Sequence, residues 1–137
     1  SEKIGVHRNT LVNYLYYLDK AQVIQLLHHC GNSTGILQKP EKIYLDNTNI
    51  SFLFSENIPD KGTIRETFFM NQLRSVFPVK APKIGDFEVD NQWIIEIGGK
   101  NKTRKQLKEL PNSFTVIDDI ETGAYQRIPL WLFGLLY

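Results

Sequence analysis

Residues 84–97 decide the fold of the second half of the chain, and they read Ile84-Gly-Asp-Phe-Glu-Val-Asp-Asn-Gln-Trp-Ile-Ile-Glu-Ile97. Apolar and polar residues alternate on both sides of Asp90-Asn91, which predicts two β-strands joined by a tight turn. A two-residue turn would mix charged and apolar side chains on one face of this hairpin. A three-residue turn or a bulge would instead gather the apolar side chains on one face, namely Phe87, Val89, Trp93, Ile95 and Ile97. Burial of that set favours the second register, which places Asp86 opposite Glu96.

Further helices and strands are expected on both sides of this hairpin. Residues 63–77 carry a broad apolar stripe at helical spacing, and Pro78 ends the predicted helix. After the hairpin, we predict a polar, lysine-rich helix over residues 101–110, a strand over residues 114–117 and an apolar terminal segment over residues 127–137. This order of elements indicates a small mixed α/β unit.

The first part of the chain has a different pattern. Gly5 occupies a turn before a predicted helix whose apolar residues recur at helical spacing. Residues 23–29 and 42–45 are rich in β-formers, and residues 31–35 supply turn chemistry between them. We interpret this order as a winged helix-turn-helix that lacks its first helix, over residues 1–58. The boundary is expected at residues 59–62, so that the mixed α/β domain covers residues 59–137 and the fold class is α+β.

Composition places the chain among folded proteins, because 42% of its 137 residues are hydrophobic and 23% are charged. The net charge is +1, so attraction to nucleic acid has to come from local patches. No apolar run approaches the roughly 20 residues of a membrane span, and the N-terminus lacks the layout of a signal peptide. The single cysteine, Cys30, is compatible with a reducing compartment. We therefore expect a cytoplasmic protein without a membrane partner.

The acidic residues of the hairpin are the main candidates for a site. Two carboxylates on one face of a hairpin lie close enough to share a metal ion, and the predicted register puts Asp86 and Glu96 in that position. Glu66, one turn into the preceding predicted helix, is positioned to add a third oxygen ligand if that helix crosses the end of the hairpin.

The sequences Ile84-Gly-Asp-Phe-Glu-Val and Ile94-Ile-Glu-Ile resemble the core of the PD-(D/E)xK, restriction-endonuclease-like superfamily. In that pattern an Asp on one strand, a Glu on the next and a Lys two residues after the Glu bind a divalent metal and activate water. The resemblance implies a restriction-endonuclease-like fold, Mg²⁺ or Mn²⁺ as cofactor, and metal ligation by Glu66, Asp86 and Glu96.

Residues 39–47, 62–75, 85–87 and 128–131 resemble the C-terminal region of bacterial AAA-type ATPases that carry a DUF4143 domain. In that family a winged helix and a nuclease-like domain follow an N-terminal P-loop ATPase. The resemblance implies that this chain is a nucleic-acid- or partner-binding module, that its partner is the ATPase domain of the same polypeptide, and that ATP binds only there.

One position departs from the nuclease pattern, because Gly98 stands where the family has its lysine. Lys100 lies four residues after Glu96, so an extended strand would point both side chains to the same face. Lys100 is therefore the candidate to orient the attacking water, and Asp86 and Glu96 are the other two candidate catalytic residues. The alternative is a nuclease fold without hydrolytic activity that serves as a non-catalytic protein-interaction domain. The sequence leaves both readings open.

Two segments are candidates for contact with DNA. Winged-helix proteins contact bases and phosphates with the N-terminal part of their recognition helix. In this chain that part of the predicted helix exposes His7, Arg8, Asn9 and Asn13. A basic segment after the hairpin, with Lys102, Arg104 and Lys105, would suit a phosphate backbone that passes the acidic pair. The alternatives are packing of the helix against an ATPase domain and a solvated face for the basic segment.

Overall fold

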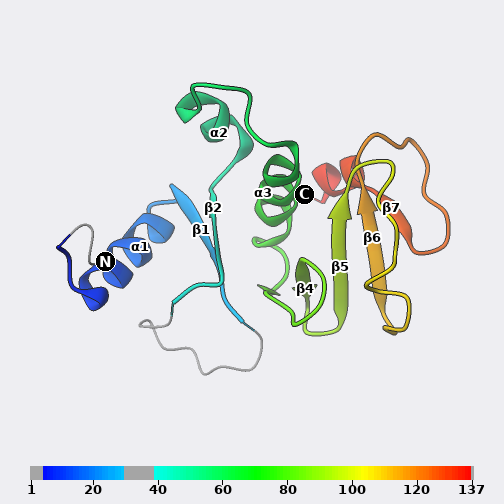
Figure 1. The fold of residues 1–137 in the computed structure, drawn as a ribbon, viewed down its shortest axis with the longest axis horizontal. Helices are drawn as coiled ribbons and strands as arrows, with labels where there is room; N and C mark the ends of the chain where they lie inside the picture. Colours follow the sequence, from blue (N-terminus) through cyan, green and yellow to red (C-terminus); the bar gives the residue numbers. More distant parts are fainter. Residues whose placement is uncertain (1–4, 30–38, 137) are drawn as a thin grey trace.

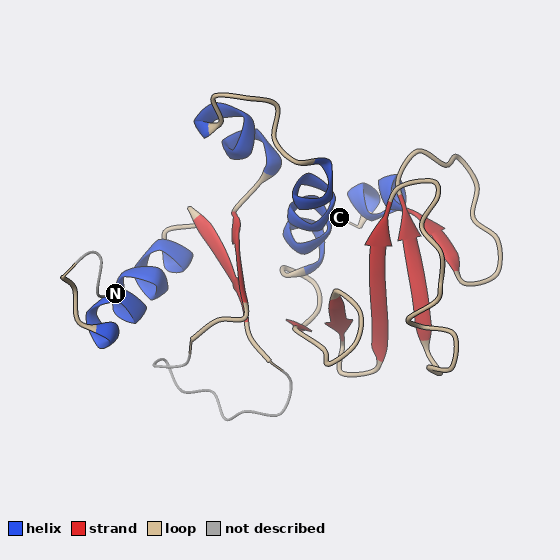
Figure 2. Cartoon of the chain, in the orientation of Figure 1, coloured by secondary structure: helices blue, strands red, loops and turns tan. Residues whose placement is uncertain are grey.

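The computed structural model describes residues 5–29 and 39–136 and has a mixed α+β architecture with two sheets (Figures 1 and 2). Its elements in chain order are α1 (Arg8–Lys20), β1 (Ile24–Leu27), β2 (Lys42–Leu45), α2 (Thr48–Phe54), α3 (Lys61–Leu73), β3 (Val79–Lys80), β4 (Phe87–Val89), β5 (Trp93–Gly98), β6 (Ser113–Ile117), β7 (Arg127–Pro129) and the 3₁₀-helix η2 (Leu130–Leu135). Among the described residues, no helix combines the length and hydrophobicity that a membrane span requires.

The first part of the chain contains α1 and a two-stranded antiparallel sheet. Gly5 has a φ of 64°, which agrees with the predicted turn before α1, because glycine adopts this backbone conformation without steric cost. Strands β1 and β2 pair with Ile24 opposite Leu45 and Leu27 opposite Lys42. The turn predicted over residues 31–35, the start of the predicted helix-turn-helix before Gly5, and Cys30 lie outside the described residues.

The second sheet has the strand order β3-β4-β5-β6-β7. Strands β3, β4 and β5 are antiparallel neighbours, whereas β5, β6 and β7 are parallel. Phe87 lies opposite Ile95 and Val89 opposite Trp93, which confirms the predicted register of the hairpin. Asp90 and Asn91 have φ values of 55° and 56°, and the N–H of Gln92 donates to the carbonyl of Val89 at 3.2 Å. The turn therefore leaves one extra residue, which shifts the apolar side chains onto one face.

The helix predicted over residues 101–110 is wrong, because this segment forms turns. It connects the parallel strands β5 and β6 and has only Leu107 fully buried. Its polar side chains are tied to the sheet, since the guanidinium of Arg104 donates to the carbonyl and hydroxyl oxygens of Ser113 at 3.2 and 2.8 Å. A lysine-rich run with so small an apolar face gains little from a regular helix, so these contacts set its path.

Three other boundaries differ from the prediction. The helix predicted over residues 63–77 is α3, which begins after Asp60, whose carboxylate accepts from Thr63 N–H at 2.8 Å, and ends at Leu73. Strand β4 begins only at Phe87, because Gly85 has a φ of 92° and interrupts the extended backbone. The short elements α2 and β3 were not predicted.

Helix α3 lies between the two-stranded sheet and the five-stranded sheet (Figure 1). The buried core draws side chains from both sheets: Leu27 and Tyr44 from the small one, and Phe69 of α3 with Phe87 of β4 on the other side. The rings of Phe69 and Phe87 are 5.2 Å apart, and those of Tyr44 and Phe87 are 5.9 Å apart. Residues on both sides of the predicted boundary at 59–62 therefore share one core.

Candidate carboxylate site

Three acidic side chains lie near the end of β5, and we call them the carboxylate cluster: Glu66 of α3, Asp86 in the bend before β4, and Glu96 of β5. Lys42 of β2 links the first two, since its ammonium lies 2.8 Å from Glu66 Oε2 and 3.8 Å from Asp86 Oδ1. The register that pairs Phe87 with Ile95 brings Asp86 beside Glu96 from the other side. The hairpin register predicted from the sequence is the observed one, and Lys42 connects Asp86 to Glu66.

Asp86 occupies the centre of the carboxylate cluster. The backbone N–H of Ile97 donates to Asp86 Oδ2 at 2.8 Å, which fixes the carboxylate over the end of β5. Burial raises the pKa of Asp86 and outweighs that hydrogen bond, and the negative charge of Glu66 adds to the rise. The residue before Asp86 is Gly85, and the space around it is too narrow for a side chain. A Cβ at this position would lie 3.0 Å from Ile94 Cγ2 and 3.1 Å from the carbonyl oxygen of Ile95.

Glu66 is held by two donors from β2. The hydroxyl of Tyr44 donates to Glu66 Oε2 at 2.5 Å, and the same oxygen accepts from Lys42. Burial raises the pKa of Tyr44, and its hydrogen bond to Glu66 raises it further, so the phenol remains a neutral donor. Lys42 and Tyr44 lie two positions apart on a strand, and such residues share a face. The alternation indicates that both side chains lie on one face of β2, but it does not identify the element that this face contacts.

Glu96 is the most buried member of the cluster, with 2% of the residue exposed. Its Oε1 lies 3.0 Å from the ammonium of Lys102, and its Oε2 has no hydrogen-bond partner. Lys102 reaches it across Gly98, where a Cβ would lie 2.5 Å from both Cβ and Cγ of Lys102. Glycine at this position therefore leaves the space through which the lysine stem passes.

A second cation lies at the same end of β5. Arg65 of α3 packs against Gly99, where a Cβ would be 3.2 Å from its Nη2, and its Nε lies 2.9 Å from Asp118 Oδ2. The Gly98-Gly99 pair thus gives room to a cation from the 99–112 connection and to one from α3.

The remaining predicted site residues lie elsewhere. Lys100 is exposed, and its backbone carbonyl accepts a hydrogen bond from Arg127 at 3.2 Å. Lys105 is exposed, whereas Arg104 is partly buried against Ser113. The predicted recognition residues are exposed at the N-terminal end of α1, on the opposite side of the small sheet from α3 (Figure 1): His7, Arg8, Asn9 and Asn13. The two segments predicted to contact DNA therefore lie on separate parts of the molecule.

The donor type of the carboxylate cluster fits a hard divalent ion, because Mg²⁺ and Mn²⁺ prefer carboxylate oxygens and Glu96 Oε2 is buried without a partner. Within residues 5–29 and 39–136, however, no three His, Cys, Asp or Glu side chains lie in an arrangement that could hold a metal ion. Lysines already lie beside all three carboxylates, with Lys42 beside Glu66 and Asp86 and Lys102 beside Glu96. A metal ion would have to displace the lysine ammonium groups from these carboxylates or bind next to them.

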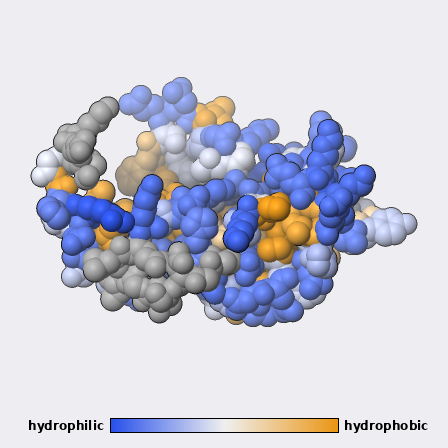
Figure 3. All heavy atoms as spheres, turned by 60° about the horizontal axis from the view of Figure 1, so that its bottom comes forward, coloured by the Kyte–Doolittle hydropathy of each residue, from blue (hydrophilic) through white to orange (hydrophobic). Residues whose placement is uncertain are grey.

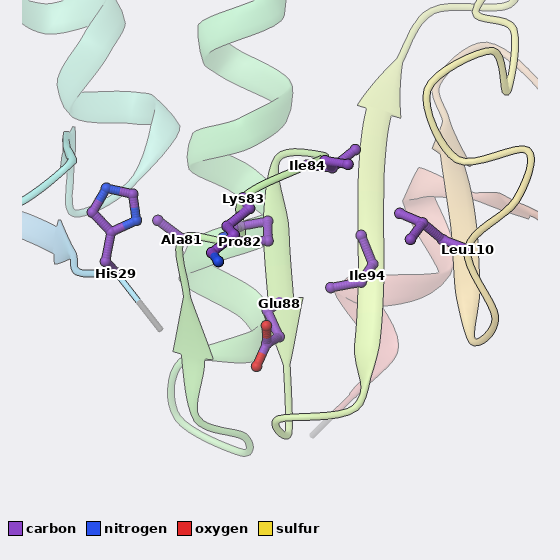
Figure 4. Close-up of a pocket in the computed structure, with 8 residues that line it drawn as sticks. All are labelled: His29, Ala81, Pro82, Lys83, Ile84, Glu88, Ile94 and Leu110. Carbon is purple, nitrogen blue, oxygen red and sulfur yellow. The ribbon is translucent and has the colours of Figure 1, made fainter. Parts of the chain in front are cut away.

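A cavity of about 560 Å³ lies along the strand face that continues from the acidic pair. Glu88 lies opposite Ile94 in this face, two residues along each strand from Asp86 and Glu96. Figure 4 shows the cavity between His29 and Leu110, with mostly apolar walls. On the face displayed in Figure 3, apolar atoms likewise gather within the half of the molecule that holds the five-stranded sheet. The acidic site thus adjoins a partly apolar hollow.

No protein-family model, curated protein or solved structure matches this chain.

Proposed function

We propose that this chain is the C-terminal nucleic-acid-engaging module of an AAA-type ATPase, and that the carboxylate cluster is a nuclease-like site that depends on a divalent metal. In this proposal residues 1–58 form a winged-helix module and residues 59–137 a restriction-endonuclease-like domain. The contacts of Lys42 with Glu66 and Asp86 support it, as do the register that places Asp86 opposite Glu96 and the mixed sheet that carries Glu96.

The observation that carries the proposal is the contact between Lys102 and Glu96. A nuclease-like site needs a cation beside its second carboxylate, and Gly98 removes the usual one. The ammonium of Lys102 lies 3.0 Å from Glu96 because its stem passes over Gly98. We therefore assign to Lys102 the role that the sequence suggested for Lys100.

Each residue of the cluster has a chemical role in this proposal. Glu66, Asp86 and Glu96 would hold Mg²⁺ or Mn²⁺, which supplies positive charge to a phosphodiester when bound. Lys102 stabilises negative charge on the phosphate and orients a water molecule. Tyr44 positions Glu66 through its hydroxyl, and the N–H of Ile97 positions Asp86.

The wider setting of the proposal follows from the same resemblance. The ATPase domain of the same polypeptide is the partner, ATP binds only in that domain, and the protein acts in the cytoplasm. The exposed start of α1 and the basic segment that includes Lys105 are the surfaces proposed to contact DNA.

Calorimetric titration of Mn²⁺ into the chain tests the metal site. Asp86→Asn and Glu96→Gln keep the shape of each side chain but remove its charge, and both should abolish saturable binding. Glu88→Gln is the matched control, because Glu88 lies on the same strand face outside the cluster. Absence of binding to the wild-type chain at millimolar Mn²⁺ would refute the metal-dependent site.

Hydrolysis of a labelled DNA substrate then tests the lysine assignment. Lys102→Met should abolish Mn²⁺-dependent cleavage while Lys100→Met leaves it unchanged. The reverse result would return the role to Lys100.

A second candidate function is a non-catalytic protein-interaction domain on a degenerate nuclease fold. The observation that favours it is that lysines already neutralise Glu66 and Glu96. In that case the carboxylates only make hydrogen bonds and ion pairs, so the two amide variants would change the free energy of unfolding while Mn²⁺ would bind to none of the proteins.

A further inference from the structure

Another cavity, of about 400 Å³, lies at the edge of the sheet where strands β5 and β6 begin. The two strands are parallel, so Trp93 at the start of β5 and Ser113 at the start of β6 stand at the same edge (Figure 1). The segment before β7 completes the cavity, and it is held to β6 because the N–H of Thr115 donates to the carbonyl oxygen of Gln126 at 2.8 Å. The volume lies within the range of small-molecule sites, about 300–1,000 Å³.

Three aromatic rings border this cavity. Those of Trp93 and Phe114 form a tilted pair with centroids 5.5 Å apart. The third belongs to Tyr125, which is 99% exposed and so adds nothing to the core. Tyr125 also has a φ of 54°, a backbone conformation that is unfavourable for a bulky residue. The fold therefore holds an unpacked aromatic ring at the rim of the cavity, at a conformational cost that packing does not explain.

The rest of the lining offers hydrogen bonds and one positive charge. Asn112 and Gln126 are exposed, and each amide carries both donors and an acceptor. The Nη2 of Arg104 donates to the carbonyl and hydroxyl oxygens of Ser113 at 3.2 and 2.8 Å. Among the described residues, no Asp or Glu lines this cavity. The lining therefore fits a flat, polar-edged ligand that is neutral or anionic, and it does not fit a cation.

The basic segment of the 99–112 connection joins this cavity to the carboxylate cluster. Lys102 lies beside Glu96 and Arg104 lines the cavity, while Lys105 is exposed. Trp93 and Glu96 are three residues apart in β5, which is roughly 10 Å along the strand. A phosphate backbone that follows these cations would pass both the cavity and the cluster.

Aromatic faces beside amide donors and acceptors are the groups that recognise a nucleobase, which stacks on rings and forms hydrogen bonds along its edge. We propose that this cavity binds a nucleobase, which stacks on Tyr125 beside Trp93 and is read at its edge by Asn112 and Gln126. The inference rests on the proposed function and deepens it, because it names an unpaired base as the part of a nucleic acid that the module engages. It requires neither a metal ion nor cleavage.

The fluorescence of Trp93 tests this inference on the whole chain in the presence of EDTA. The chain has two tryptophans, and Trp131 is 53% exposed, so Trp131→Phe leaves Trp93 as the reporter at little risk to the fold. Adenosine and a single-stranded oligodeoxyadenylate should both quench its emission saturably. The duplex of that strand with oligothymidylate should not, because its bases stay paired and stacked.

Tyr125→Ala, in the same background, should weaken binding by about tenfold, the usual effect of losing one aromatic–base stack. The exposed ring of Tyr125 makes this variant safe for the fold. Phe54→Ala removes another exposed aromatic ring, on α2, and is the matched control that should leave the affinity unchanged. A strand that binds more tightly than adenosine identifies the ligand as a base within a strand, and equal affinities identify it as a free nucleoside.

Two results would overturn the inference: no saturable quenching by adenosine or by the single strand, and equal affinity in Tyr125→Ala and its parent. A gel shift judges the proposed function separately. If the chain shifts the single strand and Tyr125→Ala shifts it equally well, the base cavity is refuted while engagement of nucleic acid stands. If adenosine quenches Trp93 but no strand is shifted, the cavity stands as a nucleoside site and engagement of nucleic acid is refuted.

Discussion

Removal of the ammonium of Lys102 should destabilise the fold strongly. In Lys102→Met the stem still covers Gly98, but Oε1 of Glu96 loses its partner at 3.0 Å and Oε2 has none to begin with. A buried charge left without its partner costs about 3–5 kcal/mol. The Glu96 side chain is 3% exposed and that of Lys102 is 35% exposed, so water weakens the lysine's share of the interaction. We therefore expect a loss of about 2–3 kcal/mol in the free energy of unfolding.

Urea unfolding followed by circular dichroism measures this loss. With a denaturant slope of about 2 kcal/mol per molar, the midpoint should fall by roughly 1–1.5 M urea. Lys105→Met, an exposed lysine in the same connection, is the matched control and should change the free energy by less than about 0.5 kcal/mol.

A double-mutant cycle identifies the cause. Glu96→Gln removes the buried charge, so adding it to Lys102→Met should restore more than half of the lost stability. A loss below about 0.5 kcal/mol in Lys102→Met, or no recovery in the double variant, would refute the view that this ion pair offsets the burial of Glu96.

Three further substitutions test the geometry of the cluster. Gly85→Ala should cost at least about 2 kcal/mol in urea unfolding, because its φ of 92° and the approach of Ile94 Cγ2 to 3.0 Å both oppose a Cβ; a cost below about 0.5 kcal/mol would contradict this. Asp86→Asn should raise the free energy of unfolding at pH 7 but not near pH 3. The pKa of Asp86 is raised in the folded state, so the unfolded chain releases this proton first as pH rises, and wild type loses stability above the ordinary carboxyl pKa; an equal effect at both pH values would disprove it. Tyr44→Phe should cost about 1 kcal/mol through loss of the hydrogen bond to Glu66, and no measurable change would argue that Lys42 alone holds that carboxylate.

The hairpin and its acidic pair could be predicted because the sequence contains the constraint that fixes them. A slip of one residue would expose Phe87, Val89 and Ile95, so only one register buries the apolar set, and Asp86 then meets Glu96. The helix carrying Glu66 was equally clear from its apolar stripe.

The partners of the carboxylates could not be predicted, since they depend on contacts between distant segments. The path of residues 99–112 follows from Leu107 and Arg104 docking on the sheet, and helical composition misled the prediction there. Only this path brings Lys102, rather than Lys100, to Glu96. Lys42 reaches Glu66 because the small sheet packs on α3, a contact that no local pattern encodes.

The core that joins the two sheets limits how the chain could be divided into fragments. Leu27 and Tyr44 are buried against Phe69 and Phe87, so a cut at the loop near residue 59 would strip apolar surface from both pieces. We expect the whole chain to melt in one calorimetric transition and residues 59–137 alone to aggregate; two separate transitions would speak against this. The loop near residue 59 separates two parts of the sequence, but the side chains of both parts pack in one core. An exchange of the small sheet with that of a related protein would have to carry the facing residues of α3 and β4 with it.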